Sequence, residues 1–432
     1  MKHPLLALIL AATALGACQR GAEPAGRNGL DAIAREFVLL SLTIGEKEEG
    51  YIDAYYGPAE LQAKAKADAP AQDLNALARR TDALQKKLEG VTSDDAMEAR
   101  RAKFLAAQLT AAATRLRMLK GEKLSFDDEA RGLFSVSPAV KPLSSYDPVL
   151  ARIDKLVPGN GELADRVDAF QNRFNIPKER LKPVFDAAIT ECRRRTLEHI
   201  QMPKEERFDM SFVTGKSWSG YNYYQGNAHS RIEINTDLPI RISRAVDLGC
   251  HEGYPGHHVL NALLEQRLTK EKGWVEFSVY PLYSPQSLIA EGSANYGIDL
   301  AFPGEDQLKF ETKTLYPLAG LPTAQAADYL ALNRAMRDLS GARFTIARDF
   351  LEGRLDEAEA ARLSRKYLLV SPERAKQLTD FTKQYRTYVI NYGLGQDMVR
   401  AYVEAAGADP KARWARMEKI LSEPTLPSDL KP

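Results

Sequence analysis

The feature that most constrains this 432-residue chain is an eight-residue segment at positions 251–258, which reads HEGYPGHH. It contains three of the six histidines of the protein and one glutamate, Glu252. Neutral imidazoles are ligands that Zn²⁺ prefers, and a neighbouring carboxylate can act as a base toward a water molecule. A polar helix cap or a buried histidine pair is the structural alternative. The concentration of histidines in one short segment favours a metal site.

The spacing of these histidines predicts an interrupted helix. In the common H-E-x-x-H pattern the second histidine lies one turn after the first, but here Pro255 occupies that position. In an unbroken helix His258 would lie about 10 Å from His251 along the axis, too far to share an ion. Proline removes a helical hydrogen bond and glycine accepts unusual backbone angles, so we expect a bulge that returns a later histidine to His251. We favour His257 as that ligand, with His258 supporting the site or facing a substrate.

A third protein ligand is expected from a helix predicted over residues 286–296. Glu291 in this segment lies 34 residues after His257, which leaves room for the motif helix to end and a second helix to begin. Asn295, one turn after Glu291, could hold a ligand histidine through its other ring nitrogen. A glutamate on a helix is most often solvated. Together with the histidine cluster, however, Glu291 is predicted to be a ligand.

These motifs resemble those of a bacterial family of metallopeptidase-like proteins that carry a domain of unknown function and are often lipoproteins. The motif H-E-x-Y-P-G-H-H and a later helix that begins E-G carry the resemblance. It is specific at residues 251–258, less so at residues 291–296, and diffuse over residues 170–400. The helical fold of this family is similar to that of carboxypeptidase Taq and the neurolysin-like zinc peptidases.

The resemblance implies a gluzincin-type site. In such a site His251, His257 and Glu291 would bind Zn²⁺, and Glu252 would be the general base. Two residues of this chain depart from the family pattern. Many members carry a tryptophan two residues after the ligand glutamate and an acidic residue seven positions after it. This chain has Ser293 and Ile298 at those positions, which leaves the metal ligands in place and bears on substrate preference.

Tyr392 is the predicted catalytic tyrosine. Zinc peptidases often use a tyrosine late in the chain to donate a hydrogen bond to the oxyanion of the tetrahedral intermediate. Tyr392 matches the late Tyr-x-x-Gly segment of the family, because Gly395 follows it by three residues. Tyr388 lies one helical turn earlier and could face the same way. A packed aromatic side chain is the alternative for both tyrosines.

The amino terminus predicts export and lipid attachment. A short positive region precedes an apolar run over residues 5–15, which is too short to span a bilayer. The run ends in LGAC at Cys18, the pattern that precedes a lipidated cysteine. We therefore predict a lipoprotein signal peptide over residues 1–17, acylation of Cys18 and a flexible tether over residues 18–29. The expected location is the periplasmic face of the cell envelope, at the outer membrane, with an ordinary secretory signal as the alternative.

Composition limits the domain organisation and the partners. The net charge is +1 and the 27% of charged residues are well mixed, which argues against a nucleic-acid partner and a polybasic membrane surface. The chain exceeds the usual size of a single core, so we expect a helical lobe over residues 30–200 and a catalytic metal-binding lobe over residues 201–432. Cys192 and Cys250 could pair in an exported protein or stay apart, and Cys250 as a metal ligand is a weaker alternative.

Helical periodicity dominates the chain and predicts a mainly α, two-lobed fold. Amphipathic helices are predicted over residues 30–48, 74–90, 94–121, 178–200, 323–350 and 356–366. Residues 211–235 instead are rich in aromatic side chains and end in the alternation of a β-strand, so a small sheet is predicted before the metal-binding helix. The edge of such a sheet could bind an extended peptide. The alternative is that these residues form a hairpin that only covers the core.

Together these features predict a zinc-dependent hydrolase, most simply a metallopeptidase that acts on peptides. Zinc would lower the pKa of its bound water to about 7. Glu252 would take a proton during attack on the carbonyl and pass it to the leaving amine. The second hypothesis is a non-catalytic, metal-stabilised envelope lipoprotein that binds or assembles, and the third is hydrolysis of a non-peptide amide or ester.

Overall fold

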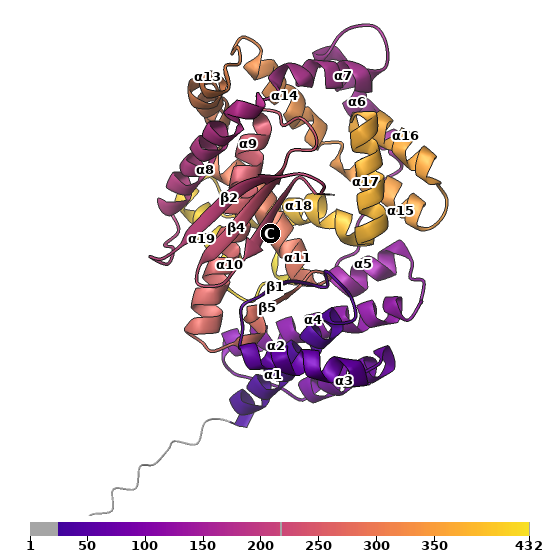
Figure 1. The fold of residues 1–432 in the computed structure, drawn as a ribbon, viewed down its shortest axis with the longest axis vertical. Coiled ribbons are helices and arrows are strands. Elements are labelled where there is room, and N and C mark those ends of the chain that lie inside the picture. Colours follow the sequence, from indigo (N-terminus) through magenta and orange to yellow (C-terminus); the bar gives the residue numbers. More distant parts are fainter. Residues whose placement is uncertain (1–24, 217, 432) are drawn as a thin grey trace, which may run out of the picture.

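The computed structural model describes residues 25–431 except residue 217. The predicted signal peptide, the predicted lipid attachment at Cys18 and the first part of the predicted tether lie outside the described residues. The described part of the chain is mainly helical, as predicted, with two small sheets (Figure 1). None of its helices is long and apolar enough to cross a membrane.

The first helix corrects one predicted boundary. The sequence predicts a flexible tether over residues 18–29 and a helix over residues 30–48, but α1 spans Ala25–Gly45. Leu30 and Ile33 are buried and hold the helix against the core. Nucleation is the costly step in helix formation, so a helix that packing already stabilises can extend by a few residues at its start without a second nucleation step. Residues 25–29 are therefore helical, and this part of the tether prediction is wrong.

Five helices of the amino-terminal part gather at one end of the molecule, at the bottom of Figure 1. They are α1, α2 (Ala59–Asp68), α3 (Leu74–Glu89), α4 (Ala96–Leu119) and α5 (Phe126–Phe134). The predicted pair α3 and α4 is present and packed together. Leu77, Leu84 and Leu88 are buried on one face of α3, and the carboxylates of Asp73 and Asp95 cap the two helices by accepting backbone hydrogen bonds.

The remaining helices form the centre and the opposite end of the molecule (Figure 1). They are α6 (Asp147–Leu156), α7 (Leu163–Gln171), α8 (Leu181–Leu197), α9 (Ser243–Leu248), α10 (His257–Leu264), α11 (Pro285–Ala301), α12 (Asp306–Phe310), α13 (Tyr316–Ala319), α14 (Ala326–Arg337), α15 (Ser340–Leu351), α16 (Glu357–Leu368), α17 (Pro372–Tyr385), α18 (Ile390–Glu404) and α19 (Pro410–Ser422). Short π-helices lie at η5 (Gly249–Gly253), η6 (Glu265–Lys270) and η8 (Glu311–Leu315). The single helix predicted over residues 323–350 is wrong, because α14 and α15 are separate helices.

The sheet predicted before the metal-binding segment is present. It consists of β2 (Arg207–Val213), β3 (Gly220–Tyr224) and β4 (His229–Asn235) in the order β2-β4-β3, with β4 parallel to β2 and antiparallel to β3. β3 and β4 pack on α10, so the sheet positions the start of that helix. A second, two-stranded sheet pairs β1 (Ile52–Tyr55) with β5 (Val279–Pro281).

Contacts cross the lobe boundary predicted after residue 200. β1 comes from the amino-terminal part and pairs with β5 from the carboxy-terminal part. α8 lies before the boundary and packs on α9 and η5 beyond it, and α6 packs on α14. These contacts show that the two predicted parts are packed together. The division into lobes at residues 30–200 and 201–432 stays a prediction.

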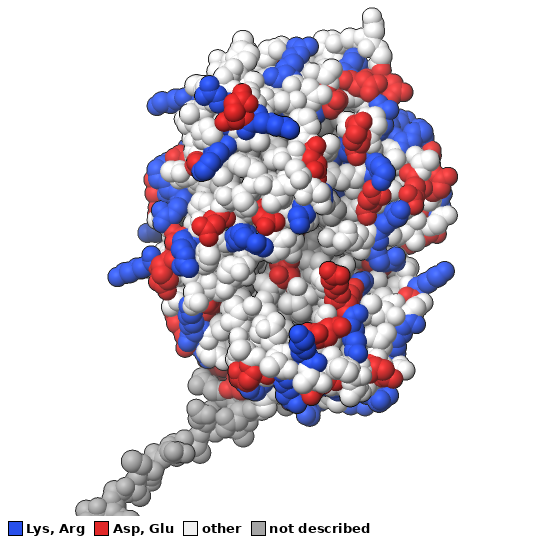
Figure 2. Space-filling model, viewed as in Figure 1, with Lys and Arg blue, Asp and Glu red and all other residues white. Residues whose placement is uncertain are grey.

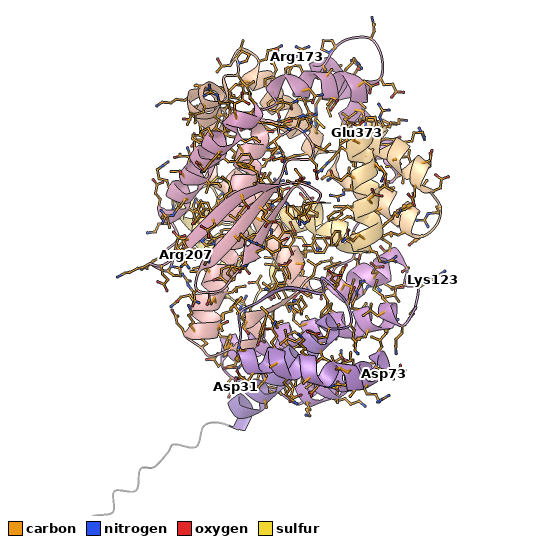
Figure 3. All side chains as sticks on the ribbon, viewed as in Figure 1. Asp31, Asp73, Lys123, Arg173, Arg207 and Glu373 are labelled. Carbon is orange, nitrogen blue, oxygen red and sulfur yellow. A yellow bond between two sulfur atoms is a disulfide. The ribbon has the colours of Figure 1, made fainter. Side chains whose placement is uncertain are left out.

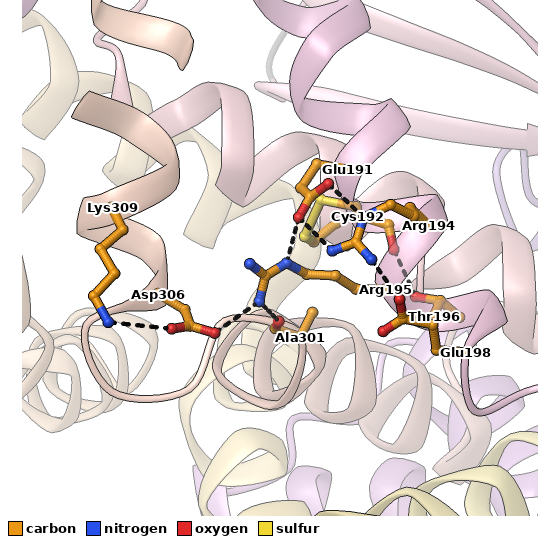
Figure 4. Close-up of polar contacts among 10 residues, drawn as sticks. Glu191, Cys192, Arg194, Arg195, Thr196, Glu198, Ala301, Asp306 and Lys309 are labelled. Carbon is orange, nitrogen blue, oxygen red and sulfur yellow. Dashed lines mark hydrogen bonds and ion pairs between the residues drawn. A yellow bond between two sulfur atoms is a disulfide. The ribbon is translucent and has the colours of Figure 1, made fainter. Parts of the chain in front are cut away.

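A disulfide and side-chain hydrogen bonds connect α8 to the centre of the molecule (Figure 4). Cys192 forms a disulfide with Cys250 of η5, so the pairing that the sequence left open is present. The Arg195 guanidinium donates to the carbonyl of Ala301 at 2.9 Å and to Asp306 at 3.1 Å, which joins α8 to the end of α11 and to α12. These contacts fix the segment that leads into the HEGYPGHH motif.

The face shown in Figure 2 carries charged side chains of both signs, as the well-mixed composition predicts. On the face shown in Figure 2, Lys, Arg, Asp and Glu alternate among uncharged residues, and no large area carries one sign alone. Figure 3 shows side chains projecting from the central sheet, the amino-terminal helices and the helices around α17.

Candidate metal centre

The HEGYPGHH motif interrupts its helix, as the spacing predicts. α9 continues into η5, Tyr254 is extended, the Tyr254–Pro255 peptide bond is cis, and α10 begins at His257. Gly256 donates its N–H to the carbonyl of Cys250 at 3.0 Å. A Cβ atom at Gly256 would lie 1.7 Å from the carbonyl oxygen of His251. Only glycine therefore allows the chain to fold back so closely on His251.

This return brings together three side chains from three helical segments, η5, α10 and α11. His251 Nε2 lies 3.1 Å from His257 Nε2 and 3.3 Å from Glu291 Oε2, and the third separation, from His257 Nε2 to Glu291 Oε2, is 3.9 Å. Zinc–ligand bonds of about 2.0–2.2 Å in a tetrahedron place neighbouring donor atoms about 3.3–3.6 Å apart. The three donor atoms therefore have separations that suit one zinc ion. No other such group was found among the described residues.

The surroundings of Glu291 fit a bound cation. Its Oε1 accepts a hydrogen bond from the Tyr388 hydroxyl at 2.9 Å. Its Oε2 is buried and has no hydrogen-bond partner among the described residues, although it faces the two histidines. A buried carboxylate oxygen without a partner carries a large desolvation cost. A cation between Oε2 and the imidazoles would remove that cost.

Asn295 orients the first histidine, as the sequence predicts. His251 Nδ1 lies 3.1 Å from Asn295 Oδ1, and Asn295 Nδ2 donates to the carbonyl of Tyr392 at 3.3 Å. With its Nδ1–H donated to Asn295, the neutral form of His251 presents an unprotonated Nε2 toward His257 and Glu291. Neutral imidazole in this orientation is the form that binds a metal.

The two helices that carry Glu291 and Tyr392 approach closely because both have glycine at the contact. A Cβ atom at Gly292 of α11 would lie 2.4 Å from the backbone carbonyl carbon of Gly395 in α18. The glycine of the E-G motif therefore permits α18 to lie against α11. This approach lets Tyr388, just before α18, reach Glu291.

Burial shifts the titration of the site in different directions. Burial, together with the neighbouring His251, lowers the pKa of His257 to about 4, so this imidazole is neutral at pH 7. Burial raises the pKa of Glu252 to about 7, and the charge of Glu291 acts in the same direction. A carboxyl group with a pKa near the working pH can both accept and release a proton. Burial also raises the pKa of Glu291, but the adjacent imidazoles of His251 and His257 and the hydrogen bond from Tyr388 lower it overall.

His258 points away from the other two histidines. It is fully buried, with Nδ1 2.8 Å from the Ser230 hydroxyl and Nε2 3.1 Å from Glu206. Tyr254 also donates to Glu206. His258 therefore joins α10 to β4 and to the segment before β2, and the expectation that it could face a substrate is wrong. The sequence offered no sign of Glu206, because its partners come from distant parts of the chain.

A cleft of about 620 Å³ opens onto the predicted site. His251, Glu252, His257 and Glu291 line it together with Tyr388 and Tyr392, while His258 does not. The Tyr388 hydroxyl is engaged by Glu291. The ring of Tyr392 lies 5.9 Å from that of Tyr388, so both tyrosines lie on one side of the cleft.

The opposite wall of the cleft includes strand β3. Ser219, Gly220, Tyr221 and Asn222 line the cleft, and β3 is an edge strand of its sheet. A Cβ atom at Gly220 would lie 2.9 Å from Glu252 Oε1, so this glycine leaves room for the carboxylate beside the strand. A larger cavity of about 1120 Å³ shares lining residues with the cleft but contains none of the predicted metal ligands.

Comparison with known proteins identifies similar folds only. No protein-family model matches the chain, and no curated protein matches it. A candidate lipoprotein from Colwellia psychrerythraea has a TM-score of 0.52 at 14% identity, over 86% of this chain and 72% of that chain. M32 carboxypeptidase from Deinococcus radiodurans R1 has a TM-score of 0.40 at 14% identity, over 92% of this chain and 90% of that chain. The first of these similarities shows that the overall fold is shared.

Proposed function

We propose that this protein is a zinc-dependent hydrolase and most simply a peptidase. The observation that carries the proposal is the group of donor atoms on His251, His257 and Glu291, together with the buried Glu291 Oε2, which faces the histidines and has no hydrogen-bond partner in the described part of the chain. These three residues would hold the ion. Zn²⁺ would supply Lewis-acid chemistry, which acidifies water and polarises a carbonyl group.

Glu252 is the proposed general base. It follows His251 directly, lines the cleft and is absent from the group of possible ligands. Its carboxylate would take a proton from the attacking water and return it to the leaving amine. The wall formed by β3 lies beside this carboxylate.

Tyr392 is the proposed donor to the oxyanion of the tetrahedral intermediate. Tyr388 is the alternative, but its hydroxyl already donates to Glu291. Tyr392 lines the same cleft, and its position is supported through the hydrogen bond from Asn295 to its carbonyl. A preorganised donor of this kind stabilises charge that develops during attack on a carbonyl.

The edge of β3 is the proposed binding surface for the substrate backbone. An extended peptide can pair with an exposed strand edge through main-chain hydrogen bonds, which need no particular side chain. Residues 219–222 lie on the cleft wall next to Glu252. This position would present a peptide bond to the base and the ion.

An envelope location is proposed together with this activity. The LGAC pattern at Cys18 supports lipid attachment, and the neighbour from Colwellia psychrerythraea is described as a candidate lipoprotein. The disulfide between Cys192 and Cys250 suits an oxidising compartment. The same features fit the second candidate function, a metal-stabilised envelope lipoprotein that binds without catalysis.

Turnover of a mixed peptide library with and without metal tests the proposed activity. The purified protein should cleave members of the library, lose this activity on chelation and regain it when Zn²⁺ is added back. Mass spectrometry of the products would measure the cleavage. A protein that carries a full complement of zinc and cleaves no peptide would contradict the peptidase proposal and favour the binding scaffold.

A further inference from the structure

The cleft contains two arginines that differ from the other cations in its wall. Five arginines line it, and three of them pair with carboxylates: Arg115 with Glu48, Arg244 with Asp247 and Arg337 with Asp299. No carboxylate oxygen of the described residues lies within 4.0 Å, the limit for an ion pair, of the Arg343 or Arg374 guanidinium. The cleft therefore holds two positive charges that no carboxylate among the described residues neutralises by direct contact.

Arg343 of α15 is held by aromatic rings. Its guanidinium carbon lies 5.2 Å from the ring centre of Phe381 and 5.5 Å from that of Tyr392. Its Nε is buried without a hydrogen-bond partner among the described residues. Stacking on aromatic rings fixes the plane of a guanidinium without cancelling its charge. Its donors are therefore oriented and available to an anion.

Among the described residues, the hydrogen-bond partners of Arg374 in α17 are neutral. It follows Glu373, which Figure 3 labels near the beginning of α17. Its guanidinium donates to the Ser219 hydroxyl at 3.3 Å and to the side-chain oxygen of Gln377. Burial, followed by the charges of Arg244 and Arg343, lowers the pKa of Arg374 to about 10, so it remains a cation at neutral pH.

These arginines lie beside the proposed metal site. Arg343 packs on Tyr392, the ring of Tyr392 lies 5.9 Å from that of Tyr388, and Tyr388 donates to Glu291. Arg374 contacts Ser219, which adjoins the β3 edge next to Glu252. The pair therefore reaches both walls of the cleft, the tyrosine wall and the strand wall.

We propose that Arg343 and Arg374 form an anion site that binds a carboxylate of the substrate. The proposal rests on the proposed hydrolase function and specifies its substrates as peptides that carry a carboxylate near the bond to be cleaved. A planar guanidinium offers paired N–H donors that match a carboxylate. The carboxylate could be the carboxy terminus of the peptide or the side chain of an aspartate or glutamate.

Binding of three matched peptides to the zinc-loaded Glu252→Gln variant tests this site and separates the two sources. The N-acetylated peptides have the same length: one has neutral side chains and a free carboxy terminus, one is its carboxy-terminal amide, and one is the amide with a single glutamate. Calorimetry should show that at least one of the two anionic peptides binds about 10-fold or more tightly than the neutral amide, as charge-assisted hydrogen bonds predict. The peptide that shows the preference identifies the carboxylate.

Substitutions assign the preference to the two arginines. Arg343→Gln and Arg374→Gln should each reduce it about 10-fold or abolish it, and Arg343→Lys should retain part of it because the charge remains. Arg337→Gln is the matched control, since Arg337 lines the same cleft but pairs with Asp299, which keeps Arg400 as a second partner. This control should leave the preference unchanged.

Equal binding of all three peptides would overturn the proposal, and so would a preference that survives in Arg343→Gln and Arg374→Gln. Failure of one variant to fold leaves the other as the test. If the unsubstituted protein hydrolyses none of the peptides but the Glu252→Gln variant still prefers a carboxylate, the anion site stands and the hydrolase function fails.

Discussion

Replacing Glu252 with glutamine is expected to lower peptide hydrolysis by about two to four orders of magnitude, the usual contribution of a positioned general base. Glutamine has nearly the same shape but cannot accept the proton of the attacking water. Glu252 is not one of the three side chains that could share the ion, so zinc content should remain that of the unsubstituted protein. Initial rates on a cleaved peptide and the metal content of the same preparations measure both effects.

A second glutamate provides the control for this substitution. Glu233 of β4 is also buried, but it pairs with Arg231 at 3.6 Å and does not line the cleft. Glu233→Gln should leave the rate nearly unchanged. A Glu252→Gln variant that retains more than about a tenth of the activity would remove Glu252 from the proposed mechanism.

Replacing both Cys192 and Cys250 with alanine is expected to lower the free energy of unfolding by about 4 kcal/mol. The disulfide closes a loop with a sequence separation of 58 residues. Without this constraint the unfolded chain gains conformational entropy, which corresponds to about that much free energy at 25 °C. Both side chains are fully buried, so the loss of two sulfur atoms from the core adds to the effect. Denaturant unfolding under oxidising conditions would measure it.

A reducing agent distinguishes loss of the disulfide from loss of packing. It should destabilise the unsubstituted protein by a similar amount and have no further effect on the double variant. Unsubstituted protein that unfolds at the same denaturant concentration with and without the reductant, after loss of the disulfide is verified by mass spectrometry, would contradict this prediction.

Local patterns in the sequence predict those features that depend on neighbouring residues. The buried leucines of α3 recur at helical spacing, which is why its bounds agree closely with the prediction. The return of His257 to His251 follows from Pro255 and Gly256, because these residues cannot continue a regular helix. The contact between Asn295 and His251 follows from the position of Asn295 one turn after Glu291.

Features that depend on distant residues could not be predicted in the same way. The break between α14 and α15 lies just before Gly341, where a Cβ atom would be 2.3 Å from the Tyr146 hydroxyl, a contact across the molecule. The hydrogen bond from Tyr388 to Glu291 depends on the close approach of α11 and α18. Whether an arginine has a carboxylate partner likewise depends on tertiary contacts, so Arg343 could not be distinguished from the other arginines.

The zinc content of four single variants tests the central claim most directly. His251→Ala, His257→Ala, Glu291→Ala and His258→Ala would each be loaded with zinc, dialysed and analysed by mass spectrometry for metal per chain. We expect the first three variants to lose the metal, while His258→Ala retains about one zinc per chain, because His258 binds Glu206 and Ser230 outside the cleft. Full zinc occupancy in His257→Ala or Glu291→Ala, or loss of zinc from a folded His258→Ala variant, would contradict the proposed metal centre.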